Sequence, residues 1–192
     1  MTGAIGVLPM TQIWIVRHGE AAASWEKDPD PGLSDLGQSQ AEETATALMD
    51  IVPTGAQLIS SPLRRAQETA AAFASKLGGG VRVDLRFSEV RSPVPLSGRK
   101  AWLQEFMCQD WSEQSDDLWA WRQDIVSGLQ EVTRPTVVFC HFLVINAVIA
   151  EIENKPEVLQ VYPANASFHE LKLEGGELSL IRLGQQMETR IN

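Results

Sequence analysis

Three segments of the sequence end in side chains that can bind or attack a phosphate group. An apolar, β-branched run at 12–16 stops abruptly at Arg17-His18-Gly19. A second short run leads into a helix start that carries Arg65, and a third stops at His141. Guanidinium groups bind phosphate oxygens through paired hydrogen bonds, and a neutral imidazole is available as a nucleophile near pH 7. These residue types therefore indicate phosphate chemistry, provided that the fold brings them together.

The elements that must position these side chains alternate between strand and helix patterns. Ser34 is predicted to cap the first helix, and Ser61-Pro62 to begin the second with a capping serine and a proline at the first helical position. Gly175-Gly176 predicts the turn of a hairpin. The alternation predicts a three-layer α/β/α fold with a mostly parallel, doubly wound sheet and an antiparallel edge hairpin. Strands are expected at 12–16, 56–60, 81–84, 136–140, 167–173 and 177–183, and helices at 36–50, 63–77, 116–132 and 142–152.

Each of the three strand ends has an ordinary structural explanation when taken alone. Arg17-His18 is compatible with a surface turn, the arginines at 64 and 65 with a solvated helix face, and His141 with a helix cap. In open parallel sheets, however, ligands bind beyond the carboxyl ends of the strands, where helix N-termini also attract anions. Convergence of the three segments on that edge favours a site, and Gly19 is expected where backbone turns sharply or approaches the ligand.

Size and composition limit the classes of protein to consider. The chain has 192 residues, of which 44% are hydrophobic and 21% charged, and this predicts a single domain over 1–192. The formal net charge of -9 argues against a nucleic-acid-binding protein. No apolar run is long enough to span a bilayer, and residues 1–9 do not resemble a signal peptide, so we expect a cytoplasmic protein without membrane contact. Residues 1–9 themselves are expected to form a flexible extension.

The cysteine and histidine spacing does not predict a metal site. Cys108 and Cys140 are far apart, no C-x-x-C occurs, and no His/Cys cluster has zinc-ligand spacing. The two cysteines are expected to be buried thiols rather than a disulfide. We therefore expect no metal and no other cofactor.

Five ordered sequence blocks resemble the histidine phosphatase superfamily, also called phosphoglycerate mutase-like. Arg-His-Gly alone is a weak match, but the five blocks occur in family order and with family-like spacing over nearly the whole chain. The blocks are Arg17-His18-Gly19; Asp30-Pro31-Gly32-Leu33-Ser34 with Gly37 and Gln40-Ala41; Ser61-Pro62-Leu63 with Arg65-Ala66 and Thr69-Ala70; Val138-Phe139-Cys140-His141; and Asn165-Ala166-Ser167.

The resemblance implies a phosphoglycerate mutase-like fold and a role for each site residue. His18 would attack phosphorus and form a phosphohistidine that water hydrolyses. Arg17, Arg65 and His141 would bind the phosphoryl oxygens as the group transfers. Glu89 stands where the family places the carboxyl group that protonates the leaving alkoxide, although an ordinary surface glutamate is the alternative. Arg64 would face solvent.

Departures from the family pattern concern the expected pocket walls. Many relatives have Thr and Asn where this chain has Ala21 and Ala23, and glycine commonly follows the second histidine, where this chain has Phe142. Many relatives also show Gly and Trp-Glu-Gly after the acid, where this chain has Val90-Arg91-Ser92-Pro93-Val94-Pro95. Since no phosphoryl-handling residue is lost, these changes are expected to alter specificity more than catalysis.

Several alternatives remain open from the sequence. Segment 90–125, with its Trp-rich part at 102–121, is either a lid over the site or a hydrophobic subcore. Glu20 either shapes the pocket floor or makes a local hydrogen bond, and His169 is expected to be a plain strand residue. We expect a phosphatase acting on a small phosphomonoester. A phosphoglycerate-type mutase, a protein phosphohistidine phosphatase and a non-catalytic phosphate-binding protein are the alternatives, and the oligomeric state is open, a homodimer included.

Overall fold

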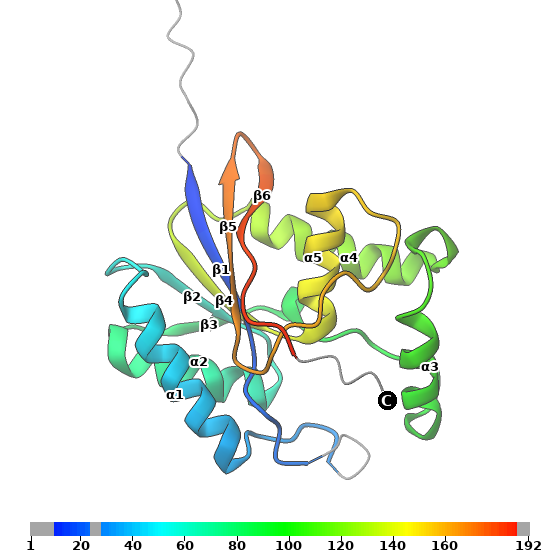
Figure 1. Cartoon of the computed structure of the whole chain (residues 1–192), viewed down its shortest axis with the longest axis horizontal. Helices are drawn as coiled ribbons and strands as arrows, with labels where there is room; N and C mark the ends of the chain where they lie inside the picture. The colour runs from blue at the N-terminus through cyan, green and yellow to red at the C-terminus, as the bar shows by residue number, and fades with distance from the viewer. Residues whose placement is uncertain (1–9, 24–27, 188–192) are drawn as a thin grey trace, which may run out of the picture.

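A six-stranded mixed sheet forms the centre of the computed structural model, which describes residues 10–23 and 28–187 (Figure 1). The strand order is β3-β2-β4-β1-β5-β6. The first four strands in the chain run parallel, β5 is antiparallel to β1, and β6 is antiparallel to β5. The predicted parallel sheet with an antiparallel edge hairpin is therefore confirmed. The strands are β1 (Thr11–Arg17), β2 (Gln57–Ser60), β3 (Val81–Val83), β4 (Thr136–Cys140), β5 (Phe168–Glu174) and β6 (Glu177–Arg182).

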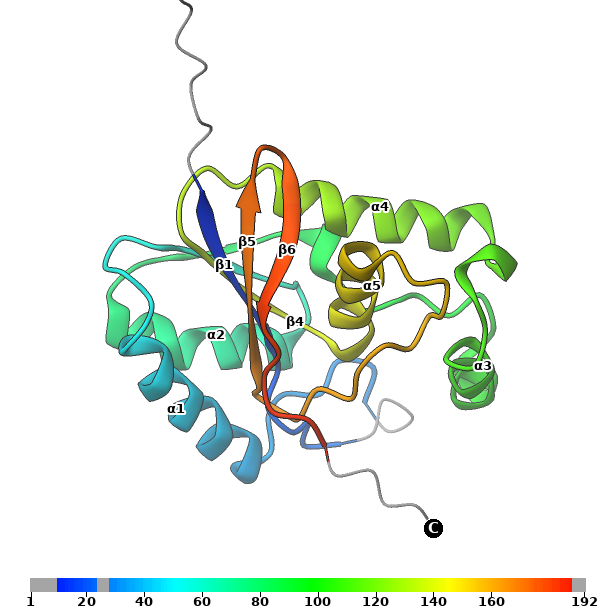
Figure 2. The same ribbon diagram turned by 45° about the horizontal axis from the view of Figure 1, so that its top comes forward.

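Helices cover both faces of the sheet, which makes the three layers expected from the sequence (Figures 1 and 2). Because side chains alternate along a strand, Trp14 and Val16 of β1 pack in one core with α1 and α2. Ile13 and Ile15 pack in the other core with α4 and α5. The helices are α1 (Asp35–Met49), α2 (Arg64–Leu77), α3 (Arg99–Phe106), α4 (Asp116–Gln130) and α5 (Phe142–Glu153).

The start of α2 differs from the prediction. Ser34 caps α1 as expected, since its side chain accepts a hydrogen bond from the Gly37 amide. Ser61 does not cap α2: that helix begins at Arg64, with Leu63 at the N-cap position and no side-chain cap. The Ser61 hydroxyl instead accepts from the Leu63 amide and pairs with His141. Because the Ser61 hydroxyl takes part in these two hydrogen bonds, it does not cap α2.

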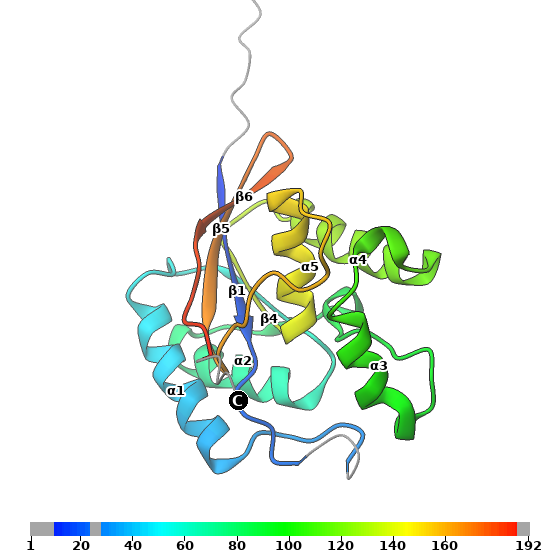
Figure 3. The ribbon, with the colours of Figure 1, turned by 45° about the vertical axis from the view of Figure 1, so that its right-hand side comes forward.

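The Trp-rich segment is part of the core on the α4 and α5 side. Trp111 is buried, stacks with Trp121 at 6.5 Å between ring centroids, and lies under the Arg122 guanidinium. The helix α3 precedes this cluster and stands apart from the sheet (Figure 3). It was not predicted, because the prolines and glycine before it suggested irregular chain. The indole rings therefore form a subcore, while α3 itself faces the cavity described below.

Three further expectations concern the cysteines, the chain ends and the membrane. Cys140 is buried as predicted, but the prediction is wrong for Cys108, which is exposed just beyond α3; both are free thiols. Residues 1–9, expected to be an extension, lie outside the described residues. No helix in the described part of the chain is long and apolar enough to cross a bilayer.

Candidate active site

The ends of β1, β2 and β4 lie level with one another, and this brings the candidate residues together. Arg17 pairs with Cys140 in the parallel register of β1 and β4. The next residues continue the pattern, because the His18 amide donates to the Cys140 carbonyl at 3.0 Å. The Ser61 amide donates to the Phe139 carbonyl at 2.9 Å. The two histidines and the start of α2 therefore meet at the carboxyl edge of the sheet, as predicted.

The hydrogen bonds of His18 fix which ring nitrogen carries the proton. Nδ1 lies 2.6 Å from the Gly19 carbonyl oxygen, which can only accept, so Nδ1 carries the proton. Nε2 then has a free electron pair, and it accepts a hydrogen bond from Arg65 Nε at 3.0 Å. Burial, followed by the charge of Arg65, lowers the pKa of His18 to about 3. The imidazole is therefore neutral across the physiological pH range.

Arg65 joins the two histidines. Its Nη2 lies 3.3 Å from His141 Nδ1, and His141 Nε2 lies 2.7 Å from the Ser61 hydroxyl. Since a guanidinium only donates, His141 Nδ1 accepts and Nε2–H donates to Ser61. Burial lowers the pKa of His141 well below its usual value, with His18 and Arg65 adding to the effect. The imidazole rings of His18 and His141 lie 5.1 Å apart between centroids.

Arg17, the last residue of β1, is held by contacts with Pro163 and Phe142. Its Nη1 donates to the Pro163 carbonyl at 2.7 Å, and its guanidinium lies 5.3 Å from the centroid of the Phe142 ring. Burial lowers its pKa to about 10, which leaves it cationic at neutral pH. The Arg17 Nε atom is buried without a hydrogen-bond partner among the described residues. An unpaired buried donor of this kind is costly, so a phosphoryl oxygen would be a stabilising partner.

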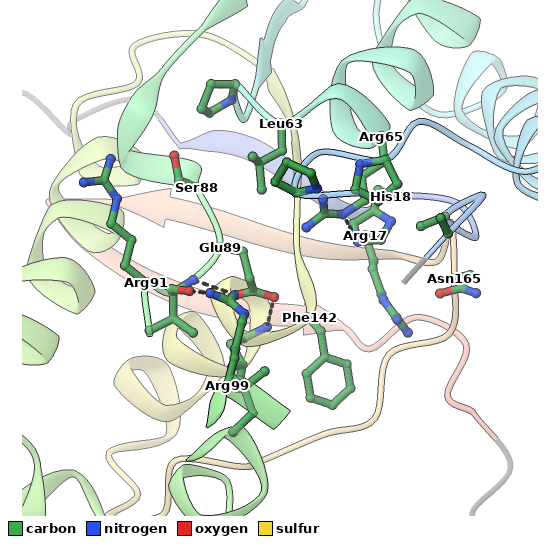
Figure 4. Close-up of a pocket in the computed structure, with 18 of the residues that line it drawn as sticks. Arg17, His18, Leu63, Arg65, Ser88, Glu89, Arg91, Arg99, Phe142 and Asn165 are labelled. Carbon is green, nitrogen blue, oxygen red and sulfur yellow. Dashed lines mark hydrogen bonds between the residues drawn. The ribbon is translucent and has the colours of Figure 1, made fainter. Parts of the chain in front are cut away.

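Glu89 lies across the cavity from His18 and Arg65 (Figure 4). One carboxylate oxygen accepts from the Val90 amide at 3.0 Å, and the other accepts from the Leu143 amide at 3.3 Å, in the first turn of α5. These bonds favour the ionised form, as does the charge of Arg65, but burial outweighs them and raises the pKa of Glu89. The surface-glutamate alternative is therefore wrong: Glu89 is half-buried and lines the cavity.

Close backbone contact with α1 holds the Arg-His-Gly turn. A Cβ atom on Gly19 would stand 2.5 Å from the Gly37 carbonyl oxygen, and one on Gly37 would overlap the Glu20 backbone. The Gly19 amide donates to the Thr69 hydroxyl at 3.1 Å. Gly19 is thus required by the approach of a helix rather than of a ligand, which refines the expectation. Glu20 accepts a hydrogen bond from the Ser34 hydroxyl and also lines the cavity. Glu20 therefore both makes a local hydrogen bond and shapes the pocket, the two alternatives given above.

Arg17, His18, Arg65 and Glu89 line one cavity of about 690 Å³, whereas His141 is fully buried and is not among the residues that line it. Glu89 and Arg65 face it, whereas the adjacent Arg64 points outward and pairs with Glu68 at 2.7 Å. The side chain of Arg65 is 11% exposed and that of Arg64 is 64% exposed. The structure therefore places the two neighbouring arginines as the sequence predicted. Ala21 and Ala23 line the same cavity.

The model of the histidine phosphatase superfamily (branch 1) matches residues 13–186. The chain belongs to the histidine phosphatase superfamily. A search of curated proteins found no match. Among solved structures, a protein described as mycobacterial hydrolase 1 has a TM-score of 0.69 and 23% identity, and the match covers 93% of this chain and 100% of the other.

Two solved phosphatases share the phosphoglycerate mutase-like fold of this superfamily member. A mycobacterial glucosyl-3-phosphoglycerate phosphatase complexed with VO3 has a TM-score of 0.66 and 23% identity, with coverage of 92% of this chain and 100% of the other. A phosphoserine phosphatase from Entamoeba histolytica, in complex with 3-phosphoglyceric acid, has a TM-score of 0.68 and 18% identity, with coverage of 93% and 98%. At these identities the likeness concerns the fold.

Sequence reasoning missed supporting residues of this superfamily site. Ser61 and Thr69 lie in the second family block, where Ser61 was interpreted as a helix cap and Thr69 only as a block member; their hydroxyls bind His141 and the Gly19 amide. Asn165 lines the cavity and was noted only as the start of the late block. His169 is buried on β5 outside the cavity-lining set, with Nδ1 accepting from the Gly184 amide. Among the described residues, no group of three or more His, Cys, Asp or Glu side chains could hold a metal ion.

Proposed function

We propose that this protein is a metal-independent phosphatase that hydrolyses a small phosphomonoester through a covalent phosphohistidine on His18. The observation that carries the proposal is the state of His18. Its Nδ1 proton is directed to the Gly19 carbonyl, and its Nε2 electron pair is directed toward Arg65 in the cavity. An imidazole held neutral and oriented in this way needs no separate base before it attacks phosphorus.

The positive charge needed during phosphoryl transfer comes from the arginines. Arg65 donates to His18 Nε2 in the unliganded site, and a bound phosphate would draw that guanidinium to its own oxygens and release the electron pair of Nε2. Arg17 supplies its unpaired Nε–H, and the buried His141, held by Ser61, contacts Arg65. Charge developing on the phosphoryl oxygens thus meets preorganised donors, the type of stabilisation that contributes most to such reactions.

Glu89 is the proposed proton donor. In the first step His18 Nε2 forms a bond to phosphorus, the ester P–O bond breaks, and the leaving oxygen takes the Glu89 proton. In the second step Glu89 accepts a proton from a water molecule while the water oxygen attacks the phosphorus of the phosphohistidine. The P–N bond breaks, which releases inorganic phosphate and restores His18. Because burial raises the pKa of Glu89, the carboxyl group remains protonated to higher pH than an exposed glutamate.

Hydrolysis is favoured over phosphate transfer between two positions of a substrate. A mutase must retain its intermediate, and the segment 90–125 that borders this cavity is of modest length. The similar solved structures include proteins named as phosphatases of glucosyl-3-phosphoglycerate and phosphoserine. The four residues that would handle the phosphoryl group are all present, which disfavours a non-catalytic binding protein.

Rapid-quench labelling with a 32P-labelled aryl phosphate tests the proposal. The wild-type protein is expected to release inorganic phosphate and to show acid-labile label, and His18→Ala is expected to show neither. His169→Asn, which removes a buried histidine outside the cavity, is the matched control and should keep both. Full turnover by His18→Ala, or loss of wild-type activity in a chelator, would contradict the mechanism. Redistribution of phosphate within phosphoglycerate without its release would identify a mutase.

A further inference from the structure

The cavity has two chemically different ends. We call Arg17, His18 and Arg65, together with the buried His141 that contacts Arg65, the catalytic end. The part of the remaining wall that we call the outer end comes from the residues before α2, from segment 85–90 and from the region of α3. The cavity is also lined by Glu20, Ala21, Ala23, Pro29, Pro31, Leu143 and Asn165. A cavity of about 690 Å³ is far larger than a phosphoryl group needs and lies in the range of sites for sizeable ligands. The outer end must therefore contact most of the leaving group. Its apolar residues are Leu63, Leu85, Val90, Leu96, Leu103 and Met107.

Two leucines of the outer end are unusually exposed. Leu85 is 73% exposed and Leu96 is 48% exposed, although each lines the cavity. Single exposed apolar residues are common, but a group of them at the mouth of a cavity is typical of a surface that a ligand covers. Phe142, at the boundary with the catalytic end, adds an aromatic ring to the same wall (Figure 4).

Two polar side chains of the outer end are hydrogen-bonded to the backbone, and Arg99 also lies beside Glu89 (Figure 4). The Ser88 hydroxyl donates to the Leu85 carbonyl at 2.6 Å, and Arg99 Nη2 donates to the Val90 carbonyl at 3.0 Å. Figure 4 shows Arg91 reaching away from His18 and Arg65. A polyol packed here would lose hydrogen bonds to water against a largely aliphatic wall, and this loss is unfavourable.

Segment 85–90 is also held in place independently of any ligand. Trp121 Nε1, from α4, donates to the Ser88 carbonyl at 3.0 Å, and Phe87 is fully buried in the core. Leu85 and Val90 are thus presented from a fixed backbone, and an apolar group that enters the cavity meets a preformed surface.

From these features we infer that the substrate is a phosphomonoester whose leaving alcohol has a large apolar body, which lies against Leu85, Leu96 and Leu103 while His18 attacks its phosphate. The inference rests on the proposed phosphatase function and names its substrate class. Hydrolysis of such an ester gives inorganic phosphate and an apolar alcohol, the alcohol oxygen taking the proton from Glu89.

A series of n-alkyl phosphates tests this directly, since ethyl, butyl and hexyl esters have leaving alcohols of nearly equal basicity. The value of kcat/KM is expected to rise about 10- to 100-fold from ethyl to hexyl phosphate, because each additional CH₂ group is removed from water. Glycerol 3-phosphate should be a poorer substrate than butyl phosphate. A flat series, or a preference for glycerol 3-phosphate, would overturn the inference while leaving the phosphatase function intact.

A charged analogue separates this inference from the possibility that Arg91 and Arg99 bind a second anion. Hexyl phosphate and 5-carboxypentyl phosphate differ at the far end of the chain. Hexyl phosphate should be preferred; a preference for the carboxylate would overturn the apolar assignment. If no ester is hydrolysed faster by the wild type than by His18→Ala, the proposed function itself fails, and with it the inference.

Substitutions at the rim complete the test with little risk to the fold. Leu85→Ser and Leu96→Ser are each expected to lower the hexyl-to-ethyl ratio of kcat/KM about 3- to 10-fold, because part of a leucine contact is lost. Ile181→Ser, which removes a 56% exposed apolar side chain from β6, is the matched control and should leave the ratio unchanged. An unchanged ratio in both leucine variants would contradict the inference.

Discussion

The two ends of the cavity are built by different means. The catalytic end consists of side chains at strand ends and at the start of α2, and its histidines are 8% and 0% exposed and joined through Arg65. The outer end comes from loops, a short 3-10 turn (Leu85–Phe87) and α3, and it includes leucines that are largely exposed. A network of buried polar contacts tolerates little change, whereas an exposed apolar wall can vary without loss of the fold. Reaction chemistry and substrate choice should therefore respond to different substitutions.

The largest effect is expected at the arginine shared by the two histidines. Arg65→Gln should lower kcat/KM for 4-nitrophenyl phosphate about 10²- to 10³-fold, because a preorganised positive charge at the phosphoryl oxygens is lost. Arg64→Gln is the matched control: that side chain is exposed and pairs with Glu68, so its removal should change kcat/KM by about twofold at most. Equal losses in the two variants would show that the exposed Arg64 contributes to catalysis as much as the buried Arg65.

A smaller and substrate-dependent effect is expected at Glu89, which lies between the two ends. Glu89→Gln should lower kcat/KM for alkyl phosphates about 10²-fold and for 4-nitrophenyl phosphate less than about tenfold, since nitrophenolate leaves without a proton. The pKa of Glu89 is raised, so the wild-type advantage on alkyl phosphates should be full at low pH and should decline as pH rises through that pKa.

The ratio of wild-type to Glu89→Gln activity across pH is the measurement that isolates this group. Ionisation of the substrate phosphate is common to both proteins and cancels in the ratio. A ratio that stays constant with pH, or equal losses on alkyl and aryl esters, would remove Glu89 from the proton-donor role and leave it as a contact of the α5 N-terminus.

The same division explains what could be predicted from the sequence. Arg17, His18 and His141 directly follow apolar runs, so the alternation of strands and helices was enough to bring them to one edge. The outer end has no comparable pattern: α3 follows Pro93, Pro95 and Gly98, which suggested irregular chain. Its contacts with the cavity depend on tertiary packing.

Two contacts that support the catalytic end likewise could not be predicted from the sequence. The approach of Gly19 and Gly37 joins residues that belong to different motif blocks, and Ser61 was assigned to a helix cap because its local context fits one. Local signals identified these residues but not their partners, which only the packing of α1 and β4 determines. The position of the site could thus be predicted from the sequence, but the hydrogen bonds and backbone contacts that hold its residues could not.

Replacement of Gly37 tests whether the catalytic end depends on the backbone contact with α1. Gly37→Ala would place a Cβ atom against the Glu20 backbone and should lower the free energy of unfolding by about 2 kcal/mol, measured by urea denaturation. Gly79→Ala is the control, because nothing lies within 4 Å of the added atom; its effect should stay within about 0.5 kcal/mol. Similar stability in both variants would mean that α1 shifts readily and does not fix the turn.

The smallest predicted effect tests whether the lowered histidine pKa values result from burial alone or are a special property of the catalytic end. All three histidines have lowered pKa values; burial is the main cause in each, and His169, outside the cavity, is lowered to about 4. Above pH 6.5 both folded and unfolded histidines are neutral, so they do not affect stability. As pH falls below 6.5 only the unfolded chain gains these protons, and each histidine costs about 1 kcal/mol of stability per pH unit.

His169→Asn should therefore reduce the loss of unfolding free energy between pH 6 and pH 5 by about 1 kcal/mol, as measured by urea denaturation at each pH. Asparagine can still accept from the Gly184 amide, which limits other effects. His18→Asn should reduce the loss by the same amount, because both histidines stay neutral in the folded protein over this interval. A reduction confined to His18→Asn would show that His169 is protonated in the folded state, and that exclusion of charge from histidine belongs to the catalytic end rather than to burial in this sheet.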